Sequence, residues 1–156
     1  DAVKFLVNEI MPKVWSKFPQ MHVTLLGSNP PIEVIELASD RVTVTGFIED
    51  VDPYFDLAKI FVSPLRYGAG MKGKIGQSMS LGIPVITTSI GAEGMDLKNG
   101  KNALIADDPD ELAKSIEKLS EDKVLWKNLS KEGRNLMKKF SPEMVTNQVV
   151  KLLNFK

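Results

Sequence analysis

The sequence predicts an α/β fold in which helices cover both faces of a doubly wound parallel sheet. Short apolar runs rich in valine and isoleucine, typical of buried strands, alternate along the chain with segments of helical periodicity. From Pro109 onward the apolar residues recur only at helical spacing, so extra helices are expected after the sheet. The chain has 156 residues, of which 43% are hydrophobic, which suffices for a single domain over residues 1–156.

The periodicity of the apolar residues places the individual elements. A first helix is expected over residues 5–18, with a kink at Pro12. Strands are expected at residues 23–26, 42–44, 60–62, 83–87 and 103–105. Helical segments are expected directly after Pro31 and at residues 54–58 and 73–81. Around the last of these, Met71, Ile75 and Met79 recur at helical spacing and are expected to face the sheet.

Composition and charge argue against several classes of function. The 20 basic and 20 acidic side chains balance, so a broad nucleic-acid or anionic-membrane surface has no electrostatic support. Cysteine is absent and His22, expected to be structural, is the single histidine, which disfavours thiolate chemistry, a Cys- or His-ligated metal and a Ser-His triad. No apolar run approaches the ~18 residues of a membrane span and no signal peptide is recognisable, so a cytoplasmic protein is expected.

The local charge balance points to a small anionic ligand such as a phosphate group. Residues 59–104 carry six basic side chains and only two acidic ones. A loop with Gly68 and Gly70 connects a strand to the start of a helix, where free amides and the helix dipole favour an anion. Lys72 and Lys74 add positive charge there. The alternative interpretation is a glycine-rich turn with solvated lysines.

The same glycines allow a second interpretation, a dinucleotide site. Gly68, Gly70 and Gly73 match the spacing G-x-G-x-x-G, which is a weak signal when it stands alone. Such a site requires an acidic residue at the end of the following strand to hold a ribose hydroxyl. That strand ends in Thr87-Thr88-Ser89, and Glu93 lies further along inside its own loop. A nicotinamide-dependent oxidoreductase is therefore the less favoured alternative.

Two further loops follow predicted strands, where an open α/β sheet places its binding crevice. Residues 91–94 could lend backbone amides or the Glu93 carboxylate to a ligand, or form a simple turn, and the sequence leaves both open. In residues 46–50, Phe47 or Ile48 could flank a flat base, although burial as a loop anchor is the commoner fate.

Several linked motifs resemble a known family. The motifs are Thr45-Gly46-Phe47-Ile48-Glu49-Asp50, Ser63-Pro64-Leu65-Arg66, Gly68-Ala69-Gly70-Met71-Lys72-Gly73-Lys74, Met79-Ser80-Leu81-Gly82-Ile83-Pro84-Val85-Ile86 and Gly91-Ala92-Glu93-Gly94. In this order and spacing, over nearly the whole chain, they resemble the C-terminal donor-binding domain of family 1/family 4 type glycosyltransferases with the GT-B fold. The resemblance implies a Rossmann-like domain of a retaining, metal-independent transferase that holds a nucleotide-diphosphate sugar.

The resemblance also implies which residues contact the donor, while catalytic residues stay unassigned. These donor-binding residues are Gly46, Ile48, Arg66, Gly68, Ala69, Gly70, Met71, Lys72, Lys74, Gln77, Glu93 and Gly94. By position, the loop 68–70 would approach the diphosphate and the sugar, with Lys72 and Lys74 near the phosphates. The loop 46–48 would cover the base, and Gln77 would lie at the ribose.

The chain departs from the family pattern at two positions. Family members commonly carry two glutamates separated by seven residues, and the corresponding positions here are Ala69 and Gln77. Ala69 is familiar in the branch with Gly-Ala-Gly followed by two lysines, so it bears mainly on sugar specificity. At Gln77 one acceptor oxygen and an amide donor replace a carboxylate that accepts from both ribose hydroxyls. Weaker nucleotide binding or a degenerate site is the alternative that Gln77 leaves open.

The resemblance sets expectations about partners as well. It implies a UDP- or GDP-linked sugar donor, no cofactor or metal, and a glycan, lipid or other acceptor in polysaccharide or glycolipid synthesis, with a parent enzyme that can be membrane-associated. Nucleic acid is not expected as a partner, and nothing signals a direct membrane contact. The chain is expected to lack both the N-terminal acceptor domain and the strand that a βαβ crossover places before its first helix, and to be inactive alone. The alternatives are a sugar-nucleotide epimerase of the same architecture and a non-catalytic nucleotide-binding domain.

Overall fold

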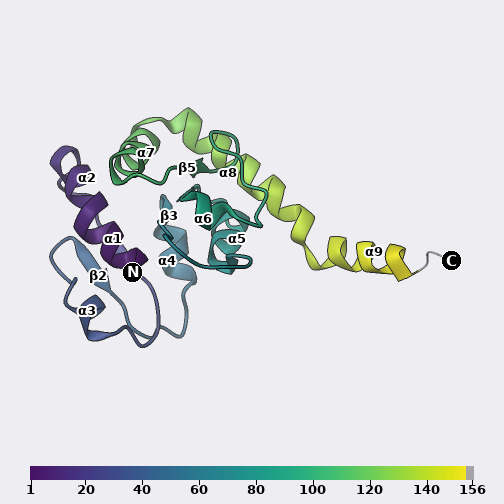
Figure 1. Ribbon diagram of the computed structural model, residues 1–156, viewed down its shortest axis with the longest axis horizontal. Helices are drawn as coiled ribbons and strands as arrows, with labels where there is room; N and C mark the ends of the chain where they lie inside the picture. The colour runs from purple at the N-terminus through teal and green to yellow at the C-terminus, as the bar shows by residue number, and fades with distance from the viewer. Residues whose placement is uncertain (154–156) are drawn as a thin grey trace.

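Five short strands form the centre of the protein, whose computed structural model describes residues 1–153 (Figure 1). The strands are β1 (Val23–Leu25), β2 (Val42–Val44), β3 (Phe61–Ser63), β4 (Val85–Thr87) and β5 (Leu104–Ile105). All pairings between them are parallel, and they form two ladders, β1-β2 and β3-β4-β5. The predicted parallel α/β fold class is confirmed. The last three residues of the predicted domain lie outside the described part of the chain.

The first helical segment is interrupted by a π-helical turn, which lies about one turn before the kink that the sequence predicts at Pro12. It consists of α1 (Ala2–Phe5), a π-helical turn η1 (Leu6–Ile10) and α2 (Met11–Lys17). Pro12 lies in the first turn of α2 rather than at the centre of a kinked helix. Because proline has no N–H to bond the carbonyl four residues earlier, the helix hydrogen bonds are rearranged in the turn before it.

Shorter helices connect the strands close to the predicted positions. They are α3 (Ile32–Ile35), α4 (Asp52–Leu57), α5 (Gly73–Ser80) and α6 (Ser89–Ala92). The helical turn α6 corrects the sequence prediction, which gives only a loop around Gly91. The Thr88 hydroxyl accepts a hydrogen bond from the Gly91 N–H at 3.1 Å and so caps this short helical turn.

Two apolar clusters show that helices cover both faces of the strands. On one face, Ile86 of β4 packs in a cluster with Ile10 and Val14 of the first helical segment and with residues of α7 (Pro109–Glu121). On the other face, Val85 of β4 packs in a cluster with Ile75 and Met79 of α5 and with Leu136 of α8 (Lys123–Met137). Neighbouring residues of one strand point to opposite faces, so this is the doubly wound arrangement.

The C-terminal part of the chain is helical, as predicted. After α7 and α8 come a 3₁₀ turn η2 (Lys138–Phe140) and α9 (Pro142–Leu153). Figure 1 shows α9 extending away from the strands. Within residues 1–153, no helix combines the length and the apolar character that crossing a bilayer requires.

The boundary between α7 and α8 depends on one capping side chain. The Asp122 carboxylate accepts hydrogen bonds from the N–H groups of Val124, at 3.0 Å, and Leu125, at 2.8 Å. Asp122→Ala is expected to lower the free energy of unfolding in urea by about 1 kcal/mol, since both amides lose their partner. Asp122→Asn, which keeps an acceptor oxygen, and Lys123→Ala, which removes no cap, should each cost clearly less. Equal losses in all three variants would contradict this role.

Candidate functional site at the carboxyl ends of the strands

A hollow of about 230 Å³ opens where β1 and β2 end and α5 begins. Its lining comes from three parts of the chain: the loop after β1, the loop and first helical turn after β2, and the exposed side of α5. The lining residues are Leu26, Gly27, Ser28, Gly46, Phe47, Ile48, Val51, Phe55, Lys74 and Gln77. Parallel strands bring their carboxyl ends to one edge of a sheet, which is why these separate loops meet.

Four of the donor-binding residues implied by the family resemblance share this hollow, and Phe47, which the sequence offers as a flank for a flat base, lines it as well. The four are Gly46, Ile48, Lys74 and Gln77. Sequence reasoning missed the apolar part of the lining, above all Leu26, Val51 and Phe55. The signal that could have found part of it is the glycine after the first strand, Gly27, which mirrors Gly46 after the second.

Two glycines leave room for a ligand to approach the backbone. Gly46 has a φ of 67° and Gly70 a φ of 76°, a region that side chains with a Cβ rarely adopt. A Cβ at either position would meet nothing within 4 Å, so the space above the backbone is open. The backbone at both loops is therefore accessible from outside.

The N-terminus of α5 has free hydrogen-bond donors beside the glycine loop. Lys72 occupies the N-cap position and its side chain caps no amide. By contrast, the carboxylate of Asp108 caps α7 by accepting from the N–H groups of Asp110 and Glu111. Since the first amides of a helix have no partner within it, α5 presents unsatisfied donors and a positive dipole end.

The two lysines at this helix differ in orientation. The Lys72 Nζ donates a hydrogen bond to the Gly70 carbonyl at 2.7 Å, so this side chain folds back over the glycine loop. Lys74 is exposed and lines the hollow next to Gln77. Positive charge is thus placed on both sides of the first turn of α5.

The glycine loop itself is open to solvent. Gly68, Ala69 and Gly70 are exposed, and Met71 is 65% exposed. The prediction that Met71 faces the sheet is wrong, because α5 begins only at Gly73 and Met71 still belongs to the loop. Ile75 and Met79, inside the helix, are buried as predicted.

Arg66 points away from the hollow in this structure. Its guanidinium forms an ion pair with Asp1, with Nε donating to Oδ2 at 2.9 Å, and lies 3.8 Å from the Glu9 carboxylate. It also lies 4.6 Å from the centre of the Phe5 ring. Arg66 therefore connects the loop after β3 to the first helical segment.

Two buried threonines hold the loop after β3 in place. The Thr87 hydroxyl donates to the Ser63 carbonyl at 2.7 Å, and the Thr88 hydroxyl donates to the Leu65 carbonyl at 2.5 Å. The threonines that the sequence shows at the end of β4, where a dinucleotide site needs an acid, thus have a structural role. Glu93 and Gly94 follow α6, are exposed, and do not line the hollow.

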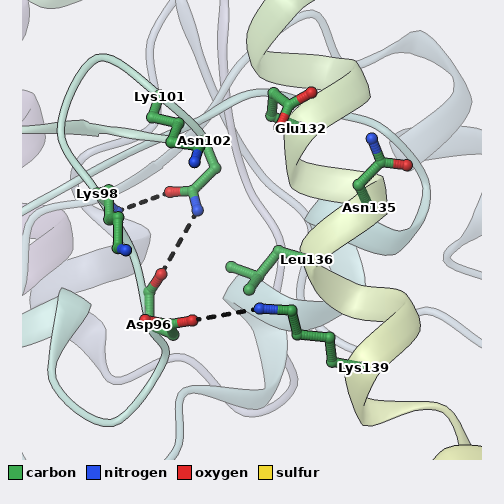
Figure 2. Close-up of a pocket in the computed structure, with 8 residues that line it drawn as sticks. All are labelled: Asp96, Lys98, Lys101, Asn102, Glu132, Asn135, Leu136 and Lys139. Carbon is green, nitrogen blue, oxygen red and sulfur yellow. Dashed lines mark hydrogen bonds and ion pairs between the residues drawn. The ribbon is translucent and has the colours of Figure 1, made fainter.

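A second hollow, of about 140 Å³, lies against α8 and was not predicted (Figure 2). Its lining mixes charges: Asp96, Lys98, Lys101, Asn102, Glu132, Asn135, Leu136 and Lys139. Asn102 is used by the fold, since its side-chain oxygen accepts from the Lys98 N–H at 2.7 Å. None of the residues implied by the family resemblance lies here.

Among residues 1–153 no group of three or more His, Asp or Glu side chains is placed to hold a metal ion.

The parallel strands, the helices on both faces and the glycine loop before α5 are the features of the Rossmann-like C-terminal domain of a GT-B glycosyltransferase. The family model of the group 1 glycosyl transferases matches residues 1–122. The chain belongs to this family.

One curated relative matches most of the chain. The chain is 27% identical over 119 residues to an uncharacterized 44.6 kDa protein in the cps region of Klebsiella pneumoniae. This match includes 70% of the chain but only 31% of the relative, so the chain spans about a third of that protein.

Solved structures show the same fold at low sequence identity. The C-terminal domain of a glycosyl transferase group 1 family protein from Francisella tularensis superposes with a TM-score of 0.69 at 18% identity, over 87% of this chain and 76% of that one. HepE from Anabaena, solved in complex with UDP and glucose, superposes with a TM-score of 0.76 at 18% identity, over 94% of this chain and 44% of that one. The predicted GT-B resemblance is confirmed at the level of family and fold.

Proposed function

We propose that this chain is the donor-binding half of a glycosyltransferase and binds a nucleoside diphosphate sugar at the carboxyl ends of the strands. The observation that carries the proposal is the position of the uncapped N-terminus of α5, between an open glycine loop and the hollow lined by Lys74 and Gln77. A diphosphate fits the free amides and lysines, and a nucleoside fits a hollow with apolar and amide surfaces.

Each part of the donor has a counterpart in this arrangement. The diphosphate is assigned to the first turn of α5 with Lys72 and Lys74, and the ribose to Gln77. The base is assigned to the hollow, against Ile48 and the apolar side chains Leu26 and Phe55. The sugar is assigned to the glycine loop and to the region of Glu93 and Gly94. The UDP and glucose in the HepE structure support a uridine donor.

The chemistry follows from the same contacts. When a sugar leaves a nucleoside diphosphate, negative charge grows on the departing phosphate. Oriented helix amides and lysine ammonium groups stabilise that charge, so neither a metal nor another cofactor is assigned to the reaction. We assign to the transfer retention of configuration at the sugar carbon. Binding of the acceptor is assigned to a part of the protein outside this chain. The chain alone is expected to bind the donor without turning it over.

Calorimetric titration of the 156-residue chain with UDP, GDP, ADP and NAD tests this proposal. We expect one uridine or guanosine diphosphate to bind with a stoichiometry of one, and NAD not to bind. Tighter binding of NAD than of every nucleoside diphosphate would favour the oxidoreductase alternative instead. No binding of any of the four nucleotides would overturn the proposal for this chain.

Gln77→Glu is expected to tighten binding of the preferred nucleoside diphosphate about 3- to 10-fold. A carboxylate accepts charge-assisted hydrogen bonds from the ribose hydroxyls, whereas the glutamine amide offers a single acceptor oxygen. The measurement is the same titration, with Ser80→Glu on the exposed side of α5 as a control for added negative charge. Equal or weaker binding by Gln77→Glu would remove Gln77 from the ribose position.

A second candidate function is favoured by one observation, the presence of Gln77 in place of a carboxylate in the hollow. It is a nucleotide-binding domain that no longer supports transfer. Native binding that is too weak to measure, restored in Gln77→Glu, is the outcome that would select this candidate.

A further inference from the structure

The helix that carries Lys74 and Gln77 is a weak helix by composition. α5 has eight residues, which read Gly-Lys-Ile-Gly-Gln-Ser-Met-Ser. Glycine is among the least favourable residues inside a helix, and helices this short are marginal without tertiary contacts. The Ser78 hydroxyl also donates to the Lys74 carbonyl at 2.8 Å, a bond that competes with the regular helix geometry. The position of α5 is therefore imposed by its neighbours.

α8 packs alongside α5 and comes close to it at two glycines (Figure 1). A Cβ at Gly133 of α8 would lie 3.3 Å from the Met79 side chain. A Cβ at Gly76 of α5 would lie 3.4 Å from the sulfur of Met137. Leu136 of α8 joins the apolar cluster on this side of the strands. The two helices thus leave little room for side chains between them at these positions, and α8 fixes how far α5 lies from the body of the protein.

The chain leaves α5 through a turn that uses two of the last helix carbonyls. The Gly82 N–H donates to the Met79 carbonyl at 2.9 Å. The Ile83 N–H donates to the Ser78 carbonyl, also at 2.9 Å. With a φ of 79° at Gly82, this is a Schellman motif, in which a residue of positive φ ends the helix. The carbonyl of Leu81 takes no part in these two bonds.

Arg134 of α8 supplies a donor for this carbonyl. Its Nη2 donates a hydrogen bond to the Leu81 carbonyl at 2.8 Å. The guanidinium lies so close to the turn that a Cβ at Gly82 would be 2.1 Å from its Nε. A cation at the C-terminus of a helix also interacts favourably with the helix dipole. Arg134 thus holds the end of α5 that is opposite to its free amides.

We propose that Arg134 is a positioning residue for the donor site. The first turn of α5 presents its free amides and Lys74 on the side of the hollow, while Arg134 holds the last carbonyls. Eight residues of helix extend only about 12 Å, so a shift at one end moves the other end as well. The inference rests on the proposed function, because the position of the first turn matters for binding only if a ligand contacts it.

The bond from Arg134 contributes something that the apolar contacts of α5 do not. Ile75 and Met79 are almost fully buried, and their burial holds the helix against the strands. Hydrophobic contact is non-directional, so it fixes the depth of α5 better than its rotation about its own axis or its position along that axis. A hydrogen bond depends on distance and angle. The bond to the Leu81 carbonyl therefore sets the direction in which the first amides and Lys74 point.

Amide hydrogen exchange tests this hold on α5 without any nucleotide. Arg134→Met removes the donor and the charge and keeps an unbranched apolar side chain. We expect the amide of Gly76 in α5 to exchange at least about fivefold faster relative to reference amides. The references are the amides of Val23 and Ala106, which are hydrogen-bonded outside α5. A general loss of stability would speed the references as well, so the ratio reports on α5 alone.

Calorimetric titration tests the consequence for the donor. We expect Arg134→Met to weaken binding of the preferred nucleoside diphosphate about 3- to 10-fold, since the first turn is no longer held in the binding orientation. Arg134→Lys keeps a donor and the charge and should recover most of the affinity. Lys131→Met removes the same charge from an exposed position of α8 and should change neither the exchange ratio nor the dissociation constant.

Unchanged exchange of the Gly76 amide in Arg134→Met would overturn the proposal. Faster exchange with an unchanged dissociation constant would overturn it too, since Arg134 would then only cap the helix. Equal effects of Arg134→Met and Lys131→Met would assign the loss to net charge and reject a specific contact. If the native chain binds none of the nucleotides, the proposed function fails and the positioning role fails with it, and the exchange ratio still shows separately whether Arg134 holds α5.

Discussion

Replacing both Lys72 and Lys74 by alanine is expected to weaken binding of the preferred nucleoside diphosphate about 10- to 100-fold. A hydrogen bond to a charged group contributes about 1.5–3 kcal/mol, and two ammonium groups beside one diphosphate are removed here. Lys72 already lies over the glycine loop through its 2.7 Å hydrogen bond to Gly70, and Lys74 lines the hollow. The measurement is the dissociation constant from calorimetric titration, and the loss should shrink at high salt because the charges are screened.

The second hollow supplies a matched control for this variant. Lys98→Ala with Lys101→Ala removes the same net charge from the lining shown in Figure 2, away from the glycine loop. We expect it to leave the dissociation constant within about twofold of the native value, since distant exposed charges are screened. Lys72→Arg with Lys74→Arg, which keeps both charges, should retain most of the affinity. If the two alanine pairs weakened binding equally, the lysines would act through net charge and not through contact.

Gly91→Ala is expected to destabilise the protein by about 2–4 kcal/mol, the largest stability effect of any substitution considered. A Cβ at Gly91 would lie 2.0 Å from the Thr87 hydroxyl oxygen and 3.4 Å from the Ser63 carbonyl oxygen. Thr87 is fully buried and its hydroxyl donates to Ser63 at 2.7 Å, so it can move only by losing that bond. Overpacking costs about 1–3 kcal/mol and a lost hydrogen bond about 1 kcal/mol more. Urea unfolding measures the loss.

Two variants make the prediction for Gly91 specific. Gly27→Ala places a Cβ where nothing lies within 4 Å, and its effect on the free energy of unfolding should stay within about 0.5 kcal/mol. Thr87→Ala combined with Gly91→Ala removes the atom that the new Cβ would meet. The double variant should therefore lose less stability than the sum of the two single variants. Strict additivity would show that the clash with Thr87 is not the cause.

The strands were the most predictable part of the fold. Residues 42–44 form β2 as expected, and the other strands lie within two residues of their predicted starts. Runs of β-branched residues between turn signals give this result because a buried parallel strand needs apolar side chains on both faces. The π-turn before Pro12 and the short α6 were not predicted, since both depend on where individual hydrogen bonds go.

The candidate site was predictable in outline and not in its interior. Glycines after strands and lysines at a helix start are local signals, and they predicted the loops that contain Gly46 and Gly70. Phe55 lies in α4, and nothing in the sequence around it marks it as part of a ligand hollow. The orientation of Arg66 toward Asp1 joins residues far apart in the chain, which no local pattern reveals.

The sequence by itself determined the α/β class, the order of the elements and the family, because strand and helix periodicity and the spacing of glycine motifs are local properties of the chain. Only the tertiary structure decided that Ile48, Lys74 and Gln77 share one hollow, that Lys72 folds over the glycine loop, and that the strands pair in two separate ladders. The physical reason is that packing and backbone pairing join segments distant in sequence. Which loops meet at the carboxyl edge, and which strands pair with one another, depends on the arrangement of the whole chain.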